Sequence, residues 1–222
     1  MLRHTLSAAL AAACLLGAAG AQAQSLSLRG GTTGLGAELG YGLSPMFGLR
    51  ANYYGGSIDY DETDAGILYE GKLKLGNGSV LLDLHPFSGS FRLTGGIVFN
   101  SNKIEATARG VGGTIEINGV NYPASDVGSL RAAITWDKTS PYLGLGWGTR
   151  PQAAGGLFAT LDLGAILGKP KASLSGTCGA AVPVFACTQL QNDIRAEERQ
   201  LQNDASDVKI YPVLSFGLGY RF

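Results

Sequence analysis

The sequence predicts an all-β protein: an eight-stranded antiparallel up-and-down transmembrane β-barrel with a structured extracellular loop region that holds a short hairpin and one helix. Three observations predict this fold. Apolar residues alternate with polar or small residues along most of the chain, as in strands with two chemically different faces. Glycine is unusually frequent, at 34 of 222 residues, against roughly 7% in average proteins. The chain also begins with an export signal.

The export signal occupies residues 1–23. Arg3 precedes an apolar run that ends at Ala19, and the small residues that follow indicate cleavage after Ala23. A lipoprotein signal ending at Cys14 is the less favoured alternative, because only alanines stand directly before that cysteine. We therefore expect residues 24–222 to form one exported domain.

The charge balance and the lengths of the apolar runs limit which class of protein this can be. Lys plus Arg and Asp plus Glu both number 17, so no nucleic-acid partner is expected. No helix-length apolar run follows residue 24, which argues against helical membrane spans. An exported, glycine-rich, alternating chain is typical of the bacterial cell outer membrane. A secreted soluble β-sandwich is the alternative.

Seven alternating segments can be followed along the chain. In a membrane barrel the apolar row of each segment faces lipid and the other row faces the interior. The segments are residues 34–43, 48–54, 80–87, 91–100, 141–148, 157–167 and 209–222. The last segment ends with the aromatic row Phe216, Tyr220 and Phe222, which we interpret as the recognition signal for the outer-membrane assembly machinery.

The connections alternate between short and long. Periplasmic turns are expected to be short, and extracellular loops longer. The short connections are Ser44–Phe47, Pro86–Ser90 and Thr149–Gly156, and the long ones are Asp61–Gly66, about 108–136 and about 169–207.

An eighth strand requires one more hairpin, because both termini should lie in the periplasm. We place this hairpin at Gly31–Thr33 and interpret Asn77-Gly78 as a β-bulge in a long strand. A turn at Asn77-Gly78 is the open alternative, since Asn-Gly is a strong hairpin signal.

The two longest loops contain predicted structure of their own. Asn118-Gly119 within "TIEINGVNYPA" indicates a small hairpin. Cys178 and Cys187 are expected to form a disulfide, since an exported chain meets an oxidising compartment. The stretch "TQLQNDIRAEERQLQNDAS" predicts a helix, and its first residue, Thr188, has capping-box spacing to Gln191. We expect this helix to pack on the other loops; recruitment of a partner is the alternative.

Six charged residues are expected to line the lumen. Eight strands enclose a space that side chains can just fill, and acids and bases confined there should pair. This favours a salt-bridged plug over a narrow polar path, although inward glycines would leave gaps for water. The candidates are Glu38, Arg50, Asp83, Arg92, Asp162 and Arg221, and the glycines are Gly144, Gly146, Gly217 and Gly219.

Catalysis is not expected. The only histidine after the signal is His85, next to a predicted periplasmic turn, and no nucleophile motif accompanies it. We interpret His85 as a hydrogen-bonding residue of the lumen or the membrane interface. No cofactor is predicted, and no metal site, because two cysteines without nearby histidines do not make a tetrahedral site.

Four segments carry a resemblance to a known family. The segments "GTTGLGAELGYGLSPMFGLRANYYGG", "INGVNYPASDVG", "SPYLGLGWG" and "GKPKASLS" resemble, in the same order, those of the CarO-type (carbapenem-susceptibility-associated) porins. The Glu/Arg-rich stretch before the last strand is similar too. The first of these segments also resembles the transmembrane domain of OmpA. The resemblance implies an eight-stranded barrel and uptake of ornithine and other basic amino acids. It supplies no binding residue, and the Cys178–Cys187 pair departs from it.

Two functions are therefore considered. The first is a narrow channel for small solutes, with basic amino acids as one candidate. The second is a closed structural or adhesive barrel whose extracellular loops do the work. For both we expect a monomer in contact with outer-membrane lipid and lipopolysaccharide, inserted by the outer-membrane assembly machinery.

Overall fold

The computed structural model describes residues 24–64, 66–110 and 112–222. The predicted signal, residues 1–23, lies outside them. Among the described residues, no helix has both the length and the apolar character needed to cross a membrane.

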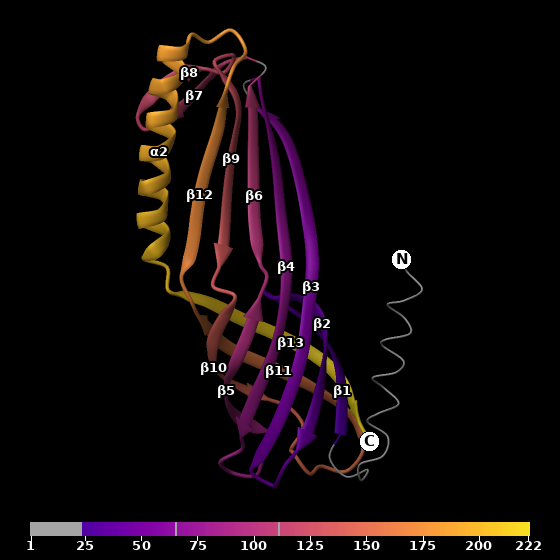
Figure 1. Cartoon of the computed structure of the whole chain (residues 1–222). Helices are drawn as coiled ribbons and strands as arrows, with labels where there is room; N and C mark the ends of the chain where they lie inside the picture. Colours follow the sequence, from indigo (N-terminus) through magenta and orange to yellow (C-terminus); the bar gives the residue numbers. More distant parts are fainter. Residues whose placement is uncertain (1–23, 65, 111) are drawn as a thin grey trace, which may run out of the picture.

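Eight antiparallel strands form a closed ring in the lower half of the molecule (Figure 1). Successive ring strands pair with one another, and β1 closes the ring by pairing with β13. This confirms the predicted eight-stranded antiparallel fold. The ring strands are β1 (Gln24–Gly31), β2 (Gly34–Gly42), β3 (Phe47–Asp64), β4 (Ile67–Leu84), β5 (Phe91–Asn100), β10 (Thr139–Trp147), β11 (Gly156–Leu167) and β13 (Ile210–Arg221).

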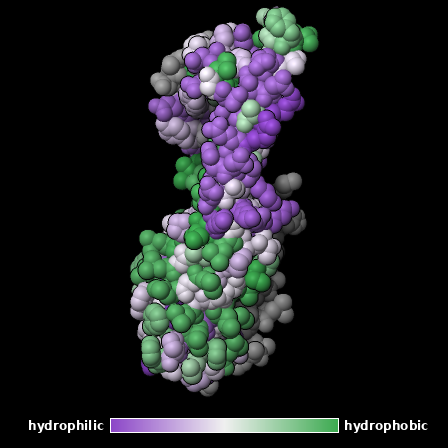
Figure 2. All heavy atoms as spheres, turned by 90° about the vertical axis from the view of Figure 1, so that its left-hand side faces the viewer, coloured by the Kyte–Doolittle hydropathy of each residue, from purple (hydrophilic) through white to green (hydrophobic). Residues whose placement is uncertain are grey.

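The two faces of the ring differ in polarity. Apolar side chains point outward, with Leu28 71% exposed and Leu157 88% exposed, whereas Arg29 and Asp162 point inward and are 3% exposed. Figure 2 shows apolar residues gathered over the lower half of the molecule and hydrophilic residues over the upper half. A soluble β-sandwich is excluded, because the strands close into one ring whose interior is polar.

The first hairpin lies where the sequence predicts it. Gly31 pairs with Gly34 across a turn at Thr32 and Thr33, and Gly34 has a φ of +102°, a conformation that suits glycine. The alternative turn at Asn77-Gly78 is excluded, because β4 runs straight through both residues.

The predicted β-bulge at Asn77-Gly78 is wrong. Asn77 and Gly78 pair with β3 in an unbroken register. The irregularity lies on the other side of β4, which pairs with β5 over residues 77–84 and with β6 over residues 67–74. Asn102 lies in the short connection between β5 and β6. Its side-chain Oδ1 accepts hydrogen bonds from the Gly76 N–H at 3.0 Å and from Asn77 Nδ2 at 2.9 Å, both on β4.

Much of the two segments expected as long loops is strand. β6 (Lys103–Gly110), β9 (Val127–Trp136) and β12 (Pro170–Cys178) continue the sheet beyond the ring from the upper part of β4 (Figure 1). Cross-strand partners such as Ile104 and Ile134 share one face of this extension, and Lys72 and Glu105 share the other. We call this part of the sheet, together with the helix and hairpin that pack on it, the outer extension.

The outer extension has its own apolar core. The helix α2 (Val184–Ser206) packs along β12, and the hairpin β7 (Thr114–Ile117) and β8 (Val120–Pro123) turns at the predicted Asn118-Gly119. The buried cluster comprises Ile67, Ile115, Ile117, Ala124, Val127, Leu174, Leu190 and Ile194.

The helix is present as predicted, but its predicted capping box is wrong. α2 begins at Val184 with Pro183 as its N-cap, and no side chain caps it. Thr188 lies inside the helix, where its hydroxyl donates to the Val184 carbonyl at 2.9 Å. The first turn is instead tied to β12 by the predicted disulfide Cys178–Cys187, which the structure contains.

Side chains of α2 also satisfy the backbone of β12 along its free edge. Gln202 Oε1 accepts from the Ala172 N–H at 2.9 Å, and Gln191 Nε2 donates to the Gly176 carbonyl at 2.9 Å. Glu198 accepts from the Leu174 N–H at 3.2 Å. An edge strand with unpaired backbone groups is a template for pairing with another chain, and α2 blocks that pairing here.

Candidate functional site

Six strands each contribute one charged side chain to a single layer across the interior of the ring. Inward positions alternate with outward ones, and the register of neighbouring strands brings these six side chains together. All six are at most 6% exposed. They are Arg29 on β1, Glu38 on β2, Arg50 on β3, Asp83 on β4, Arg92 on β5 and Asp162 on β11. We call this set the charged layer.

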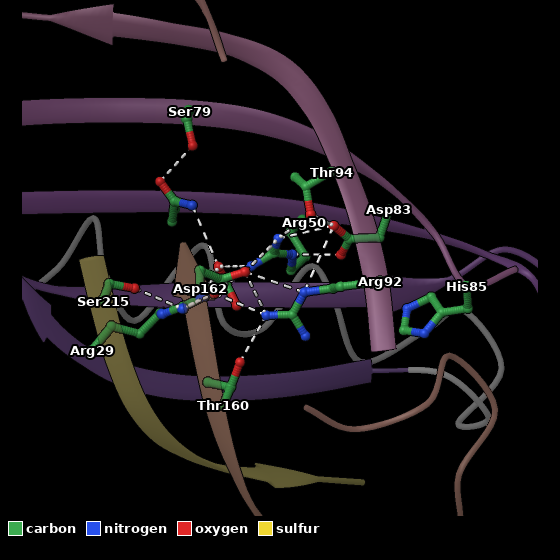
Figure 3. A network of polar contacts seen from close by, with 12 residues as sticks. Arg29, Arg50, Ser79, Asp83, His85, Arg92, Thr94, Thr160, Asp162 and Ser215 are labelled. Carbon is green, nitrogen blue, oxygen red and sulfur yellow. Dashed lines mark hydrogen bonds and ion pairs between the residues drawn. The ribbon is translucent and has the colours of Figure 1, made fainter. Parts of the chain in front are cut away.

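Asp162 is the centre of the charged layer, lying between three guanidinium groups (Figure 3). Arg92 Nη2 donates to both of its carboxylate oxygens at 2.8 Å. Arg29 also donates to Asp162, and Arg50 Nη2 lies 3.4 Å from it. One carboxylate therefore holds side chains from three other strands.

The other two carboxylates complete the charged layer. Glu38 Oε2 accepts from Arg29 Nη1 at 2.6 Å and from Arg50 Nη1 at 2.9 Å. Asp83 Oδ1 accepts from Arg50 Nη2 at 2.9 Å and from the hydroxyl of Thr94 at 2.7 Å. Arg50 is thus bonded to all three acids, and removing one acid leaves buried guanidinium groups without full compensation.

Glycines make room for the charged layer. A methyl group at Gly146 would lie 2.5 Å from Asp162 Oδ1, and one at Gly217 would lie 2.9 Å from Arg29 Cγ. The sequence suggested that the inward glycines leave gaps for water. That interpretation is wrong, because neighbouring side chains occupy the space beside Gly144, Gly146, Gly217 and Gly219.

The structure brings together five of the six predicted lumen residues, and the sixth lies apart. Arg221 is buried near the end of the barrel where Phe222 N–H donates to the Gln24 carbonyl, and Arg221 Nη1 donates to the Pro151 carbonyl. Arg29 was missed by the sequence reasoning. The signal that could have found it is the alternation of Ser25, Ser27 and Arg29 with two leucines in "SLSLRGG".

His85 follows β4, outside the charged layer. It is 2% exposed, and its Nδ1 lies 2.8 Å from the Gly89 carbonyl, which requires an N–H at Nδ1. Its ring is therefore engaged with its own turn.

The charged layer separates two cavities inside the ring, and Arg50 lines both. Each cavity has a volume of about 30 Å³, which is room for one or two water molecules. One wall of the upper cavity is apolar, formed by Leu81, Val98, Tyr142, Ile166 and Val213, and Arg29, Asp162 and Ser215 lie on its polar side. His85 and Arg221 line the lower cavity.

Three polar atoms of residues that line the upper cavity are buried without a hydrogen-bond partner among the described residues. They are Arg29 Nε, Thr33 Oγ1 and Asn77 Oδ1. Buried polar atoms are normally satisfied by protein or water. Their position and the size of the cavity indicate that it holds water.

Two solved structures superpose on most of the chain. CarO of Acinetobacter baumannii superposes with a TM-score of 0.60 at 21% identity, covering 90% of this chain and 98% of that chain. CarO2 of the same organism gives 0.58 at 20% identity, covering 90% and 99%. The chain has the fold of CarO. No family model and no curated protein sequence matches it.

The remaining predicted residues lie on the outer surface of the ring or in the outer extension. Phe216, Tyr220 and Phe222 point outward and are 55%, 46% and 62% exposed. Their role as an assembly signal stays a prediction. Within the described residues, no group of three or more His, Cys, Asp or Glu side chains could hold a metal ion.

Proposed function

We propose that the chain is an outer-membrane barrel that passes small solutes, and that its charged layer is the constriction. The apolar outer surface of the ring supports the membrane placement, as does the likeness to CarO. The observation that carries the channel proposal is the pair of small cavities on either side of this layer, with Arg50 in the wall of both. Solute passage then requires the ion pairs around Asp162 to rearrange rather than a backbone segment to move.

The class of solute follows from the cavity walls. The upper cavity combines an apolar wall with two unpaired acceptor atoms and the guanidinium of Arg29. Among the described residues, the interior buries four arginines and three carboxylates, a surplus of one positive charge. This surplus favours small zwitterionic solutes over simple cations. Basic amino acids, which the resemblance implies, fit through their carboxylate but gain nothing from their extra positive charge.

Conductance across a planar bilayer tests this proposal. Asp162→Ala and Arg92→Ala both remove contacts of the charged layer, so each is expected to raise the mean conductance severalfold over the wild-type protein. The control is Arg195→Ala, because Arg195 lies on the exposed side of α2 and bonds only within the helix. If both layer variants conduct no better than this control, the charged layer is not the constriction.

A second candidate function is a closed barrel that carries a working extracellular part. The observation that favours it is the outer extension, which has its own buried core, a disulfide and a helix. Silence of the wild-type protein and of both layer variants at every voltage would support this candidate instead. Under either function we propose a monomer inserted by the outer-membrane assembly machinery, without catalytic activity.

A further inference from the structure

All seven lysines of the chain lie in one zone, between the ring and the outer extension. One lies on each of β4, β6 and β12, and a second lies two residues away on β4. The other three lie in the connections next to the ring strands β10, β11 and β13. The seven lysines are Lys72, Lys74, Lys103, Lys138, Lys169, Lys171 and Lys209. The inward face of the ring carries arginines instead.

Three of these lysines form a row across adjacent strands. Lys74 on β4 pairs with Lys103 on β6. Lys103 and Lys171 on β12 both pair with Thr135 of β9, which lies between them. Neighbouring strands are about 4.8 Å apart, so the three ammonium groups share one face within a short span. Their side chains are 51%, 41% and 68% exposed. We call them the lysine row.

The carboxylates nearby do not use up this positive charge. Glu105 lies 2.8 Å from Lys103 Nζ and 3.7 Å from Lys74 Nζ, so one acid serves two lysines. Asp137 lies 3.2 Å from Lys171 Nζ. Exposed ion pairs of this kind contribute little energy. Lys138, Lys169 and Lys209 form no ion pair with the described residues.

Like charges directly opposite each other on adjacent strands destabilise a sheet. Lys74 and Lys103 face each other in this way, and Glu105, the carboxylate that both contact, compensates only one of the two charges. The remaining charge favours an anion outside the protein. The location indicates which anion. The outward row of β5 ends in Ile97 and Phe99, and the lysine row begins just beyond, so it stands where the apolar surface gives way to water.

We propose that the lysine row binds the phosphate groups of a phosphorylated lipid in the outer leaflet. This rests on the membrane placement under the proposed function, and it adds the site at which the expected lipid partner is bound. The contact is one-sided, because the β1–β2 turn at Thr32 and Thr33 carries no basic residue at the same end of the ring. Lipid phosphate therefore gathers on the side of the ring from which the outer extension rises.

The test compares two triple variants in detergent micelles. Lys74→Gln, Lys103→Gln and Lys171→Gln together remove the lysine row. Arg109→Gln, Arg195→Gln and Arg199→Gln remove the same charge from exposed positions of the outer extension. Binding of bisphosphorylated lipid A and of its dephosphorylated form is measured by native mass spectrometry.

The wild-type protein and the arginine variant are expected to bind the bisphosphorylated lipid, and both should prefer it to the dephosphorylated form. Each lysine near an anionic surface contributes roughly fivefold to binding, so the lysine variant should lose on the order of a hundredfold in affinity. Equal affinities of the two triple variants would overturn the proposal. Equal binding of both lipid forms would overturn it too.

Two further measurements test whether the site binds free phosphate instead of lipid, and whether the protein is a membrane protein at all. If millimolar inorganic phosphate displaces the lipid completely, the row is a free-anion site and the lipid proposal fails. Wild-type protein that stays soluble without detergent would remove the membrane placement itself, whatever the lysines bind. A lysine variant that still needs detergent and still shows heat-dependent gel mobility is folded, so its loss of lipid affinity can be assigned to the row.

Discussion

Inside the ring, arginine side chains extend into space that glycines on neighbouring strands leave open. Arg92 lies directly opposite Gly146, and Arg29 lies opposite Gly217. The guanidinium groups can reach Asp162 only because these positions lack a Cβ atom. The inward glycines are therefore part of the charged layer, although they carry no charge.

Replacing one of these glycines should weaken the barrel. In Gly146→Ala the new methyl group would lie 2.7 Å from the backbone carbonyl of Leu161, which cannot move easily, and 2.5 Å from Asp162 Oδ1. Overpacking of this kind costs about 1–3 kcal/mol. We expect a lower urea midpoint for unfolding in detergent.

The control for this prediction is Gly95→Ala, which adds the same methyl group to the ring. At Gly95 the nearest atom is a side-chain carbon of Leu143 at 3.8 Å, which is an ordinary contact. If the two variants unfold at the same urea concentration, the close packing beside Gly146 does not limit stability.

At the same scale, the sequence predicts which side chains point inward but not which of them meet. Alternation alone places Glu38, Asp83 and Asp162 inside. Their convergence depends on strand register and tilt, which set the height of each residue in the barrel. Arg221 faces inward as predicted but lies too far along β13 to join the others. Arg29 escaped notice because its strand is short and directly follows the signal.

Among the elements, the hairpin β7–β8 is attached to α2 mainly through Asp193. The hydroxyl of Tyr122 donates to this carboxylate, and Asn118 Nδ2 donates to it at 3.2 Å. Tyr122 and its neighbours hold the pKa of Asp193 below its ordinary value of 3.8. Burial, with this hydrogen bond, raises the pKa of Tyr122 to about 12.

The contact should therefore weaken at both ends of the pH range. A depressed carboxylate pKa stabilises the folded form above its ordinary value, and this contribution is lost as the pH falls below about 4. A raised tyrosine pKa stabilises the folded form below about pH 10, and its contribution is lost as the pH rises toward 12. Limited proteolysis across residues 114–123 should show faster cutting at both extremes.

Asp193→Asn is the control for the acid limb, since it cannot be protonated in this range. Its hairpin should be cut at the same rate at pH 3 and at pH 6 by an acid-tolerant protease. A wild-type protein with no acid-dependent change in cutting would contradict the role of Asp193.

In the outer extension, some elements could be predicted from the sequence and others could not. The hairpin turn, the disulfide and the presence of a helix follow from local signals such as Asn118-Gly119. β6, β9 and β12 do not, because their apolar faces are made largely of alanine and their outer faces are charged, which resembles a polar loop. Their pairing with β4 is a long-range contact that a single segment does not reveal.

For the whole molecule, the surplus of buried guanidinium groups should decide which ions pass. Arg221 lines the lower cavity and has no carboxylate partner among the described residues, so its charge is uncompensated. Arg221→Gln is expected to shift the reversal potential in a KCl gradient toward cation preference. Arg150→Gln, in an exposed turn, should leave it unchanged. An equal shift in both variants would show that surface charge sets the preference.

The fold of the whole molecule is its most predictable property. Alternation with a period of two, a polar inward row and short connections at one end together specify a closed ring, because each strand must bury its polar face. The length by which the sheet extends beyond the ring could not be predicted from this alternation. It arises from β3 and β4, whose pairing continues far beyond their last ring neighbours.

β3 and β4 have a mechanical consequence. Each runs for 18 residues without a bulge between them, from the layer that holds Arg50 and Asp83 to the outermost tip. Because their pairing is uninterrupted, the two strands form one stiff hairpin, and the lower part of this hairpin belongs to the wall of the ring. A force on the tip is therefore transmitted to these two side chains, because no flexible segment lies between them and the tip.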